Sequence, residues 1–321
     1  MNAPEKIAPP IDVAPAIGVI ARREKALMRF ATAITVLNIL GHLWLGFEAS
    51  WITPFVALAA AYSTEVAGEV AMARSLGRTP RFLGGGFKGL VMFMLSAHIT
   101  GLAVSMLLYA AEQLWAVAFA ASAAVASKYL FRMPVGPNGA SRHFLNPSNF
   151  GIALTLVLFP TIGISAPYQF AENITGAIDW LLPLVIVTTG SMINIKLTRR
   201  LPLIGAWLAG FAAQAAIRAA IFGTPLAAGL APMTGFAFVL FTFYMVTDPA
   251  TTPESARNQR FFGAAVAFTY GLLMMAHIVF GLFFALVIVT GVRGIFLTLV
   301  EWQRRWSARQ ILATSAPVYA E

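Results

Sequence analysis

Two polar segments of this sequence carry the side chains best suited to bind a ligand. The first is GPNGASRHFLNPSNFG, residues 136–151, and the second is TFYMVTDPATTPESARNQRFFG, residues 242–263. Each contains an Asn or Asp directly before a proline, Asn146 and Asp248. Such pairs are typical of helix starts, because the side chain caps free N–H groups and proline suits the first helical position. Capping accounts for these two residues but leaves the other polar residues of both segments unexplained.

The remaining polar residues predict a site for a planar, polar or phosphorylated molecule. Helix N-termini present free N–H groups and a partial positive charge, which attract anions and polar ring edges. Glycine lets the backbone approach a ligand closely. We expect the following side chains to converge on one site: Arg142, His143, Asn146, Asn149, Thr247, Asp248 and Thr252.

Ionisable side chains also interrupt the long apolar stretches, where they are costly and usually functional. Glu65 and Glu69 have the i,i+4 spacing that places them on one face of a helix. At 1.5 Å per residue, Glu65 and His98 lie at similar depths in their helices. We therefore predict that Glu65 and His98 hydrogen-bond to each other, and that the three groups carry protons or a cation. The alternative is a structural hydrogen bond, for example between Glu65 and Ser96.

Other residues in the apolar stretches give weaker signals. His42 and His277 could ligate a b-type haem, but their expected depths differ by about 6 Å. Arg218 is expected near a helix end, from which its side chain reaches the membrane surface. The chain contains no cysteine, which excludes disulfides, thiolate-ligated iron–sulfur clusters and cysteine nucleophiles. No metal site is predicted.

The composition places these residues in a membrane protein. Of the 321 residues, 59% are hydrophobic and only 11% are charged, whereas soluble domains have about 25% charged residues. A spanning helix needs about 20 mostly apolar residues. We predict an all-α fold with about ten transmembrane helices, at residues 30–48, 51–73, 89–110, 113–131, 149–167, 180–195, 201–223, 232–247, 261–281 and 283–300.

The positive charges predict the orientation of these helices. With both termini in the cytoplasm, all but one of the 22 Lys and Arg residues fall on the cytoplasmic side, and Arg218 is the exception. The net charge of +9 is thus explained by membrane orientation, and no nucleic-acid partner is predicted. Residues 1–29 and 301–321 are expected as cytoplasmic tails around a transmembrane domain at 30–300. The first tail is rich in proline and has no apolar core typical of a signal peptide.

The two polar segments resemble a known family. GPNGASRHFLNPSNFGIALTLVLFP, followed by FYMVTDPATTP and RFFG, is similar to the pattern of the RnfD/NqrB family, membrane subunits of Rnf and Na⁺-translocating NADH:quinone reductase complexes. The likeness covers roughly residues 85 to 300. It implies a flavin (FMN or riboflavin) near the membrane surface, electron transfer through the membrane, and a bacterial inner-membrane location. Implied partners are the lipid bilayer and other membrane or cytoplasmic redox subunits.

One motif departs from the family pattern. Family members carry a covalent flavin mononucleotide on the last Thr of a Ser/Thr-Gly-Ala-Thr motif on the outer side. This chain matches the first three positions from Thr175, but Ile178 stands at the acceptor position. Isoleucine has no hydroxyl to form a phosphoester, so any flavin is expected to bind noncovalently. The departure also makes this chain similar to shorter, stand-alone members of the family outside ion pumps.

These observations lead to one functional prediction and two alternatives. The prediction is a flavin-binding electron-transfer subunit that is not a complete enzyme alone. The chain has no Gly-rich nucleotide fingerprint, so NADH oxidation by this chain by itself is not expected. The alternatives are a non-redox transporter or channel for a flavin-like or anionic small molecule, and a scaffold subunit without a ligand.

Overall fold

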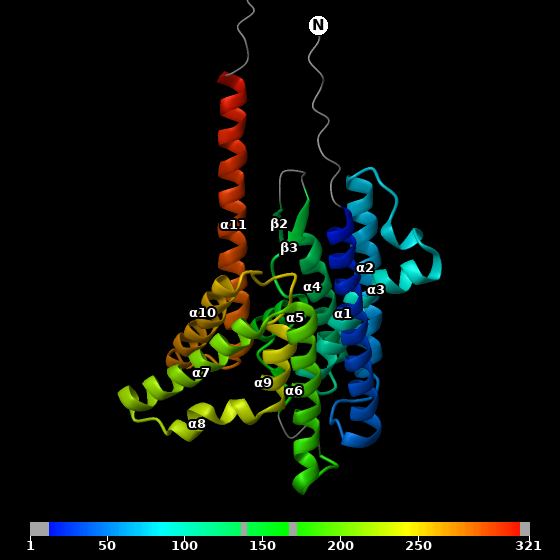
Figure 1. The fold of residues 1–321 in the computed structure, drawn as a ribbon. Coiled ribbons are helices and arrows are strands. Elements are labelled where there is room, and N and C mark those ends of the chain that lie inside the picture. Colours follow the sequence, from blue (N-terminus) through cyan, green and yellow to red (C-terminus); the bar gives the residue numbers. More distant parts are fainter. Residues whose placement is uncertain (1–12, 136–139, 167–171, 315–321) are drawn as a thin grey trace, which may run out of the picture.

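The computed structural model describes residues 13–135, 140–166 and 172–314, and they form a bundle of helices with very short strands (Figure 1). The α-helices are α1 (Val13–Leu40), α2 (Thr53–Ser75), α3 (Gly86–Leu107), α4 (Leu114–Leu130), α5 (Pro147–Leu158), α6 (Leu181–Ile193), α7 (Leu201–Phe222), α8 (Leu226–Leu230), α9 (Phe236–Leu240), α10 (Ala256–Met275) and α11 (Gly281–Thr314).

Shorter helical turns and two small sheets complete these elements. The turns are η1 (Gly41–Leu45), η2 (Arg81–Leu83), η4 (Gly176–Trp180), η5 (Asn194–Thr198), η6 (Ala231–Thr234) and η7 (Phe241–Met245). The strands are β1 (Leu108–Tyr109), β2 (Arg132–Pro134), β3 (Ser141–His143) and β4 (Gly163–Ile164). β1 pairs with β4 and β2 pairs with β3, both antiparallel.

Among the described residues, six helical segments are long and apolar enough to cross a membrane. They are Glu24–Leu45, Thr53–Ser75, Gly86–Leu107, Gly176–Thr198, Leu201–Phe222 and Gly281–Ala308. A seventh candidate consists of two helical pieces, Leu226–Thr234 and Phe236–Met245, bent by 67° at their junction. The chain is therefore a helical membrane protein.

Each of the ten predicted ranges contains a helix, but several of these helices are shorter than a span. Helix α4 has 17 residues and α5 has 12. At 1.5 Å per residue α5 is about 18 Å long, against about 30 Å of hydrocarbon in a bilayer. It ends early because Phe159 precedes Pro160, and a residue before proline is driven out of the helical region. The predicted span 149–167 is thus only partly helical.

Small residues let the helices on either side of the polar segments pack closely. Helix α4 packs between α2 and α5, α7 packs along α10, and α11 contacts α10, α5 and β2. Gly151 of α5 lies against Ala120 and Ala124 of α4, where a Cβ would collide with the α4 backbone. Close approach through small residues is typical of membrane helices, which lack a hydrophobic drive to associate. The packing holds the start of α5 firmly against its neighbours.

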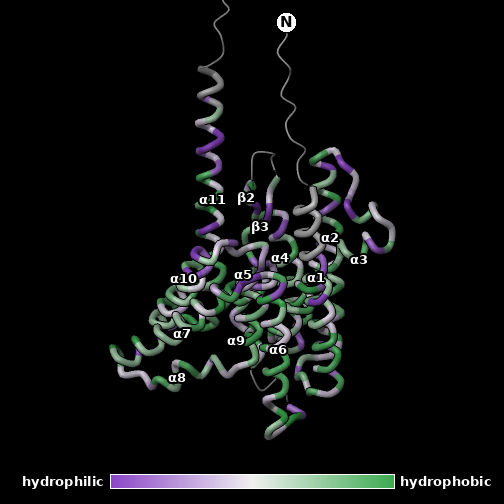
Figure 2. The backbone as a smooth tube through the Cα atoms, viewed as in Figure 1, coloured by the Kyte–Doolittle hydropathy of each residue, from purple (hydrophilic) through white to green (hydrophobic). Residues whose placement is uncertain are grey.

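Both described ends of the chain lie at the same end of the molecule. The start of α1, the end of α11, the α2–α3 turn and the β2–β3 hairpin are at the top of Figure 1. Figure 2 shows that hydrophilic residues are frequent in these segments, whereas hydrophobic residues dominate the helices below them. We call this the basic end, because the α2–α3 turn, the helix ends beside it and the hairpin carry Arg74, Arg78, Arg81, Lys88, Arg132 and Arg142.

Candidate functional site

A cavity of about 540 Å³ lies between α1, α3, α6 and η7. Its long walls are apolar and include Phe30, Leu37, Ile99, Ile186 and Phe243. Its polar end is formed by the two segments that the sequence singled out, together with η5. The polar lining there comprises His143, Asn146, Ser148, Asn194, Thr198, Thr247 and Asp248.

Four of the predicted ligand-binding residues therefore line one cavity: His143, Asn146, Thr247 and Asp248. The other three of that set, Arg142, Asn149 and Thr252, do not line it, and neither does Thr175 of the motif on the outer side. Asn149 and Thr252 are almost fully buried, at 1% and 0% exposure, and Arg142 is half-buried beside His143. Thr175 is exposed and precedes η4, the short helix before α6, without a side-chain capping bond.

Asn146 holds the first segment against the second. Its side-chain oxygen accepts hydrogen bonds from the Asn149 N–H and the Ser148 hydroxyl, both at 3.1 Å, which caps α5. Its amide also donates to the Met245 carbonyl at 3.2 Å, just before the Thr-Asp-Pro sequence. Asn149 in turn donates to the Phe283 carbonyl of α11 at 2.9 Å. Asn146 is thus a helix cap, as predicted, and also a link between the two segments.

The Asp248-Pro249 pair does not start a helix, which corrects the capping expectation for this segment. The Asp248 carboxylate instead accepts the Ala250 N–H at 2.9 Å and forms a local turn. The Asp248 carbonyl accepts the Thr252 hydroxyl at 2.6 Å. The next helix, α10, begins at Ala256 with Ser255 as its cap. Asp248 therefore shapes a loop whose backbone groups are satisfied without a helix.

Two arginines outside the predicted set of site residues hold this loop. Arg200 donates to the Pro253 carbonyl at 2.7 Å and to the Pro249 carbonyl at 3.5 Å. Arg293 of α11 donates to the Thr251 carbonyl at 2.9 Å. The sequence does carry a signal for Arg293. It lies inside an apolar stretch, where a charged side chain needs a specific partner.

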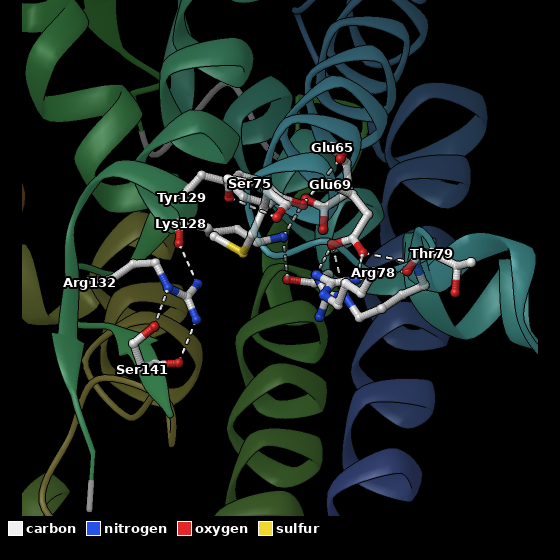
Figure 3. Close-up of polar contacts among 12 residues, drawn as sticks. Glu65, Glu69, Ser75, Arg78, Thr79, Lys128, Tyr129, Arg132 and Ser141 are labelled. Atoms are coloured by element: carbon white, nitrogen blue, oxygen red, sulfur yellow. Dashed lines mark hydrogen bonds and ion pairs between the residues drawn. The ribbon is translucent and has the colours of Figure 1, made fainter. Parts of the chain in front are cut away.

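The predicted pairing of Glu65 with His98 is wrong. Glu65 is 3% exposed, and its Oε2 accepts a hydrogen bond from Nζ of Lys128 in α4 at 2.5 Å (Figure 3). The same ammonium group donates to the Ser96 hydroxyl at 3.2 Å. Lys128 is itself only 7% exposed, so the two buried charges neutralise each other.

His98 has different partners on two neighbouring helices. Its Nδ1 lies 2.6 Å from the Tyr62 hydroxyl of α2, and its Nε2 lies 2.7 Å from the Thr35 hydroxyl of α1. Tyr62 precedes Glu65 by three residues, which separates their directions by about 60° around the helix. Equal depth in the membrane therefore did not imply contact between Glu65 and His98. On α2, Glu65 faces Lys128 of α4, whereas Tyr62 faces His98 of α3.

Glu69 has the role of an anchor for the α2–α3 turn. Its Oε1 accepts a hydrogen bond from the Arg78 guanidinium at 2.6 Å and from the Arg81 N–H at 2.8 Å. Its Oε2 accepts the Arg81 Nε at 2.8 Å. The carboxylate is fully buried, and Figure 3 shows it beside Arg78. With both oxygens occupied by arginines, Glu69 is poorly suited to pass a proton to Glu65.

The two histidines considered as haem ligands lie in different parts of the fold, His42 in η1 and His277 between α10 and α11. His42 contacts the Asn38 carbonyl of its own helix at 3.0 Å, and His277 is exposed in the turn between α10 and α11. In residues 13–135, 140–166 and 172–314 no group of three or more His, Asp or Glu is placed to hold a metal ion.

Comparison of the chain with models of protein families and with curated proteins gives no match. The resemblance to RnfD/NqrB therefore stays a prediction based on the two polar segments.

Proposed function

We propose that the chain is a membrane subunit of an electron-transfer system and holds a flavin noncovalently in the cavity. The main support is a pair of stacked aromatic rings in the cavity wall, Phe30 of α1 and Tyr244 of η7. Their centroids are 4.8 Å apart and their planes differ by 23°. The Tyr244 hydroxyl is held by Thr189 of α6 at 2.8 Å. Such a pair offers a fixed aromatic surface to a planar ring system.

The dimensions and lining of the cavity fit an isoalloxazine ring. Cofactor pockets have volumes of about 300–1,000 Å³ and are mostly apolar with a few polar groups, and this one has about 540 Å³. Asn194, Thr247 and Asp248 at its polar end suit the polar edge of the ring, while Phe30 and Tyr244 suit its face. A bound flavin would supply the redox chemistry. The side chains would bind it, orient it and exclude water.

The charge distribution supports the proposed orientation. In this proposal the basic end faces the cytoplasm of a bacterial cell, and the chain crosses the inner membrane about ten times. The polar end of the cavity then lies near the cytoplasmic surface. Other membrane or cytoplasmic redox subunits would deliver and remove the electrons.

An absorption spectrum of the purified protein tests the proposal. We expect the visible bands of oxidised flavin, either as purified or after incubation with riboflavin or FMN. Tyr244→Ala removes the aromatic surface and should weaken flavin binding at least about tenfold. Tyr244→Phe keeps the ring and serves as the matched control. A protein that binds neither flavin, or binds them equally well with Tyr244→Ala, would contradict the proposal.

One observation favours the alternative of a non-redox transporter. The cavity follows the whole length of α6, because its lining includes Ile174 and Ile178 before the helix and Asn194 and Thr198 after it. A passage between the two ends of the molecule would need such a shape. Uptake of radiolabelled riboflavin into vesicles containing the protein, without bound flavin in the purified protein, would favour transport. A protein that neither binds nor transports flavin would be a scaffold.

A further inference from the structure

Arg200 and Arg293, from distant parts of the sequence, hold the loop after η7, and a third arginine, Arg142, lies two residues before Phe144, which packs against Gly294 beside Arg293. Arg142 belongs to β3, Arg200 lies between η5 and α7, and Arg293 belongs to α11. Burial lowers the pKa of Arg200; the charges of Glu254 and Asp248 oppose this effect, and the charge of Arg142 adds to it. The charges of Arg142 and Arg200 also act on Arg293. The three guanidinium groups are therefore close enough to repel one another.

The known contacts of this cluster do not cancel its charge. Arg200 and Arg293 bind backbone carbonyls of the loop, which are neutral. The carboxylates whose charges reach Arg200 are those of Glu254 and Asp248. The Asp248 carboxylate already accepts the Ala250 N–H within its own turn. Three cations therefore face two carboxylates, one of which is partly engaged elsewhere.

The cluster also contains buried N–H groups that have no partner among the described residues. The Nε atoms of Arg142 and Arg200 are buried and make no hydrogen bond there, and Arg200 as a whole is 5% exposed. An unsatisfied buried donor costs about 1–3 kcal/mol, and more when it is charged.

Helix orientation adds further positive potential at the same place. Helix α7 begins at Leu201, directly after Arg200, and α10 begins at Ala256, just beyond the Pro253 carbonyl that Arg200 binds. Helix N-termini carry a partial positive charge, so a cation beside them is unfavourable unless an anion is present. The like charges, the unpartnered N–H donors and the helix N-termini all favour an anionic ligand.

We propose that Arg142, Arg200 and Arg293 form a binding site for a phosphate group beside the polar end of the cavity. Arginine suits this role because its planar fork of donors matches the oxygens of a phosphate. Arg142 directly precedes His143, and Arg200 follows Thr198 by two residues, and both of these neighbours line the cavity. The phosphate belongs to a ligand in the cavity or to a phospholipid headgroup.

This inference rests on the proposed flavin function in one respect, since a phosphate at the arginines selects FMN over riboflavin. The full chain in nanodiscs of phosphatidylcholine is titrated with FMN and with riboflavin, and binding is followed by quenching of flavin fluorescence. FMN should bind at least about tenfold more tightly, as expected for a charge-assisted contact. Inorganic phosphate should compete with FMN but not with riboflavin.

Two variants isolate the contribution of the cluster. Arg142→Gln removes a charge that makes no carbonyl contact in the loop, and should abolish the preference for FMN while riboflavin still binds. Arg199→Gln is the control, because Arg199 is an exposed arginine directly beside Arg200, and it should keep the preference. If Arg142→Gln fails to fold, Arg142→Lys retains the charge and loses the planar fork, and should weaken FMN binding alone.

The remaining outcomes separate the two possible sources of the phosphate and the two proposals. If the preference for FMN falls in nanodiscs of phosphatidylglycerol, an anionic headgroup occupies the same site. Equal binding of FMN and riboflavin in both lipids, unaffected by inorganic phosphate, would overturn the arginine site and leave the flavin proposal intact. If neither flavin binds, inorganic phosphate should still raise the melting temperature of the wild type but not of Arg142→Gln. If inorganic phosphate does not raise the melting temperature of the wild type, the phosphate site is overturned as well.

Discussion

Lys128 lies in surroundings that restrict what can replace it. Its ammonium group is buried among α2, α3 and α4 and lies 2.5 Å from the Glu65 carboxylate. Removing one member of a buried ion pair leaves the other charged and without compensation, which is more costly than removing both. The pair therefore ties α4 to α2 and is sensitive to single substitutions.

We predict that Lys128→Met lowers the free energy of unfolding by about 3–5 kcal/mol, because the Glu65 carboxylate loses its counter-charge. The double variant with Glu65→Leu should recover much of this loss. Unfolding in mixed micelles of SDS, followed by circular dichroism, measures both. The control is Glu301→Gln, which breaks the more exposed Glu301–Arg305 pair on α11 and should cost less than about 1 kcal/mol. A Lys128 variant no less stable than this control would refute the argument.

Sequence reasoning identified Glu65 as a buried group but not its partner. Counting residues gives the depth of a side chain and says nothing about the direction in which the helix turns it. In the sequence, Lys128 is one of 22 Lys and Arg residues that indicate membrane orientation, and only the structure shows it as a buried partner of Glu65 in the last turn of α4. Asn146 was predicted correctly, because a cap depends on local sequence alone.

We predict that acid denaturation releases any bound flavin, because Ile178 stands at the acceptor position and an isoleucine cannot form a phosphoester. The measurement is flavin fluorescence on a denaturing gel, which should be absent from the polypeptide band. A band that remains fluorescent would show a covalent link elsewhere in the chain. Ile178→Thr supplies the missing hydroxyl, and it is the variant in which attachment by a flavin transferase becomes chemically feasible.

At the scale of elements, the start of α5 differs from the start of α10 in what its cap touches. Asn146 caps α5 and also bonds the Met245 carbonyl of η7. The α10 cap bond of Ser255 goes to Asn258 within its own helix. Loss of a cap alone costs about 1 kcal/mol, so any additional effect at Asn146 reports the link between the two polar segments.

We therefore predict that Asn146→Ala lowers stability by about 2 kcal/mol, the sum of a cap and one further buried hydrogen bond. Ser255→Ala should cost about 1 kcal/mol and leave flavin binding unchanged. In Asn146→Ala the affinity for flavin should fall by more than the stability loss explains, because both segments line the cavity. Equal effects of the two substitutions on stability and binding would mean that Asn146 is only a cap.

Helix positions could be predicted from the sequence better than helix lengths. Apolar runs located a helix in each predicted range, but the end of α5 depends on Pro160, which the apolar count ignored. The course of the loop after Asp248 depends on contacts with Arg200 and Arg293, which come from distant parts of the chain. Such long-range contacts leave no local pattern in a single sequence.

At the scale of the whole molecule, the placement of the basic end gives a direct test of orientation. Ser141 is exposed in β3, and Glu112 is exposed in the connection that follows α3, a helix that starts beside the α2–α3 turn and is long enough to cross the membrane. The chain has no cysteine, so single cysteines can be introduced without background. We predict that Ser141→Cys reacts with a membrane-impermeant maleimide only after the cells are opened, whereas Glu112→Cys reacts in intact cells. The reverse pattern would invert the proposed topology.

Helix α11 has a consequence for structure determination. Its 34 residues extend over about 51 Å, whereas the hydrocarbon layer is about 30 Å thick. It therefore rises beyond the other helices at the basic end (Figure 1), and Trp302 and Trp306 stack along its side with centroids 5.7 Å apart. A soluble helical protein fused in register to this projection would move rigidly with the bundle. It would serve as a fiducial for aligning single-particle images of a 34.4 kDa chain.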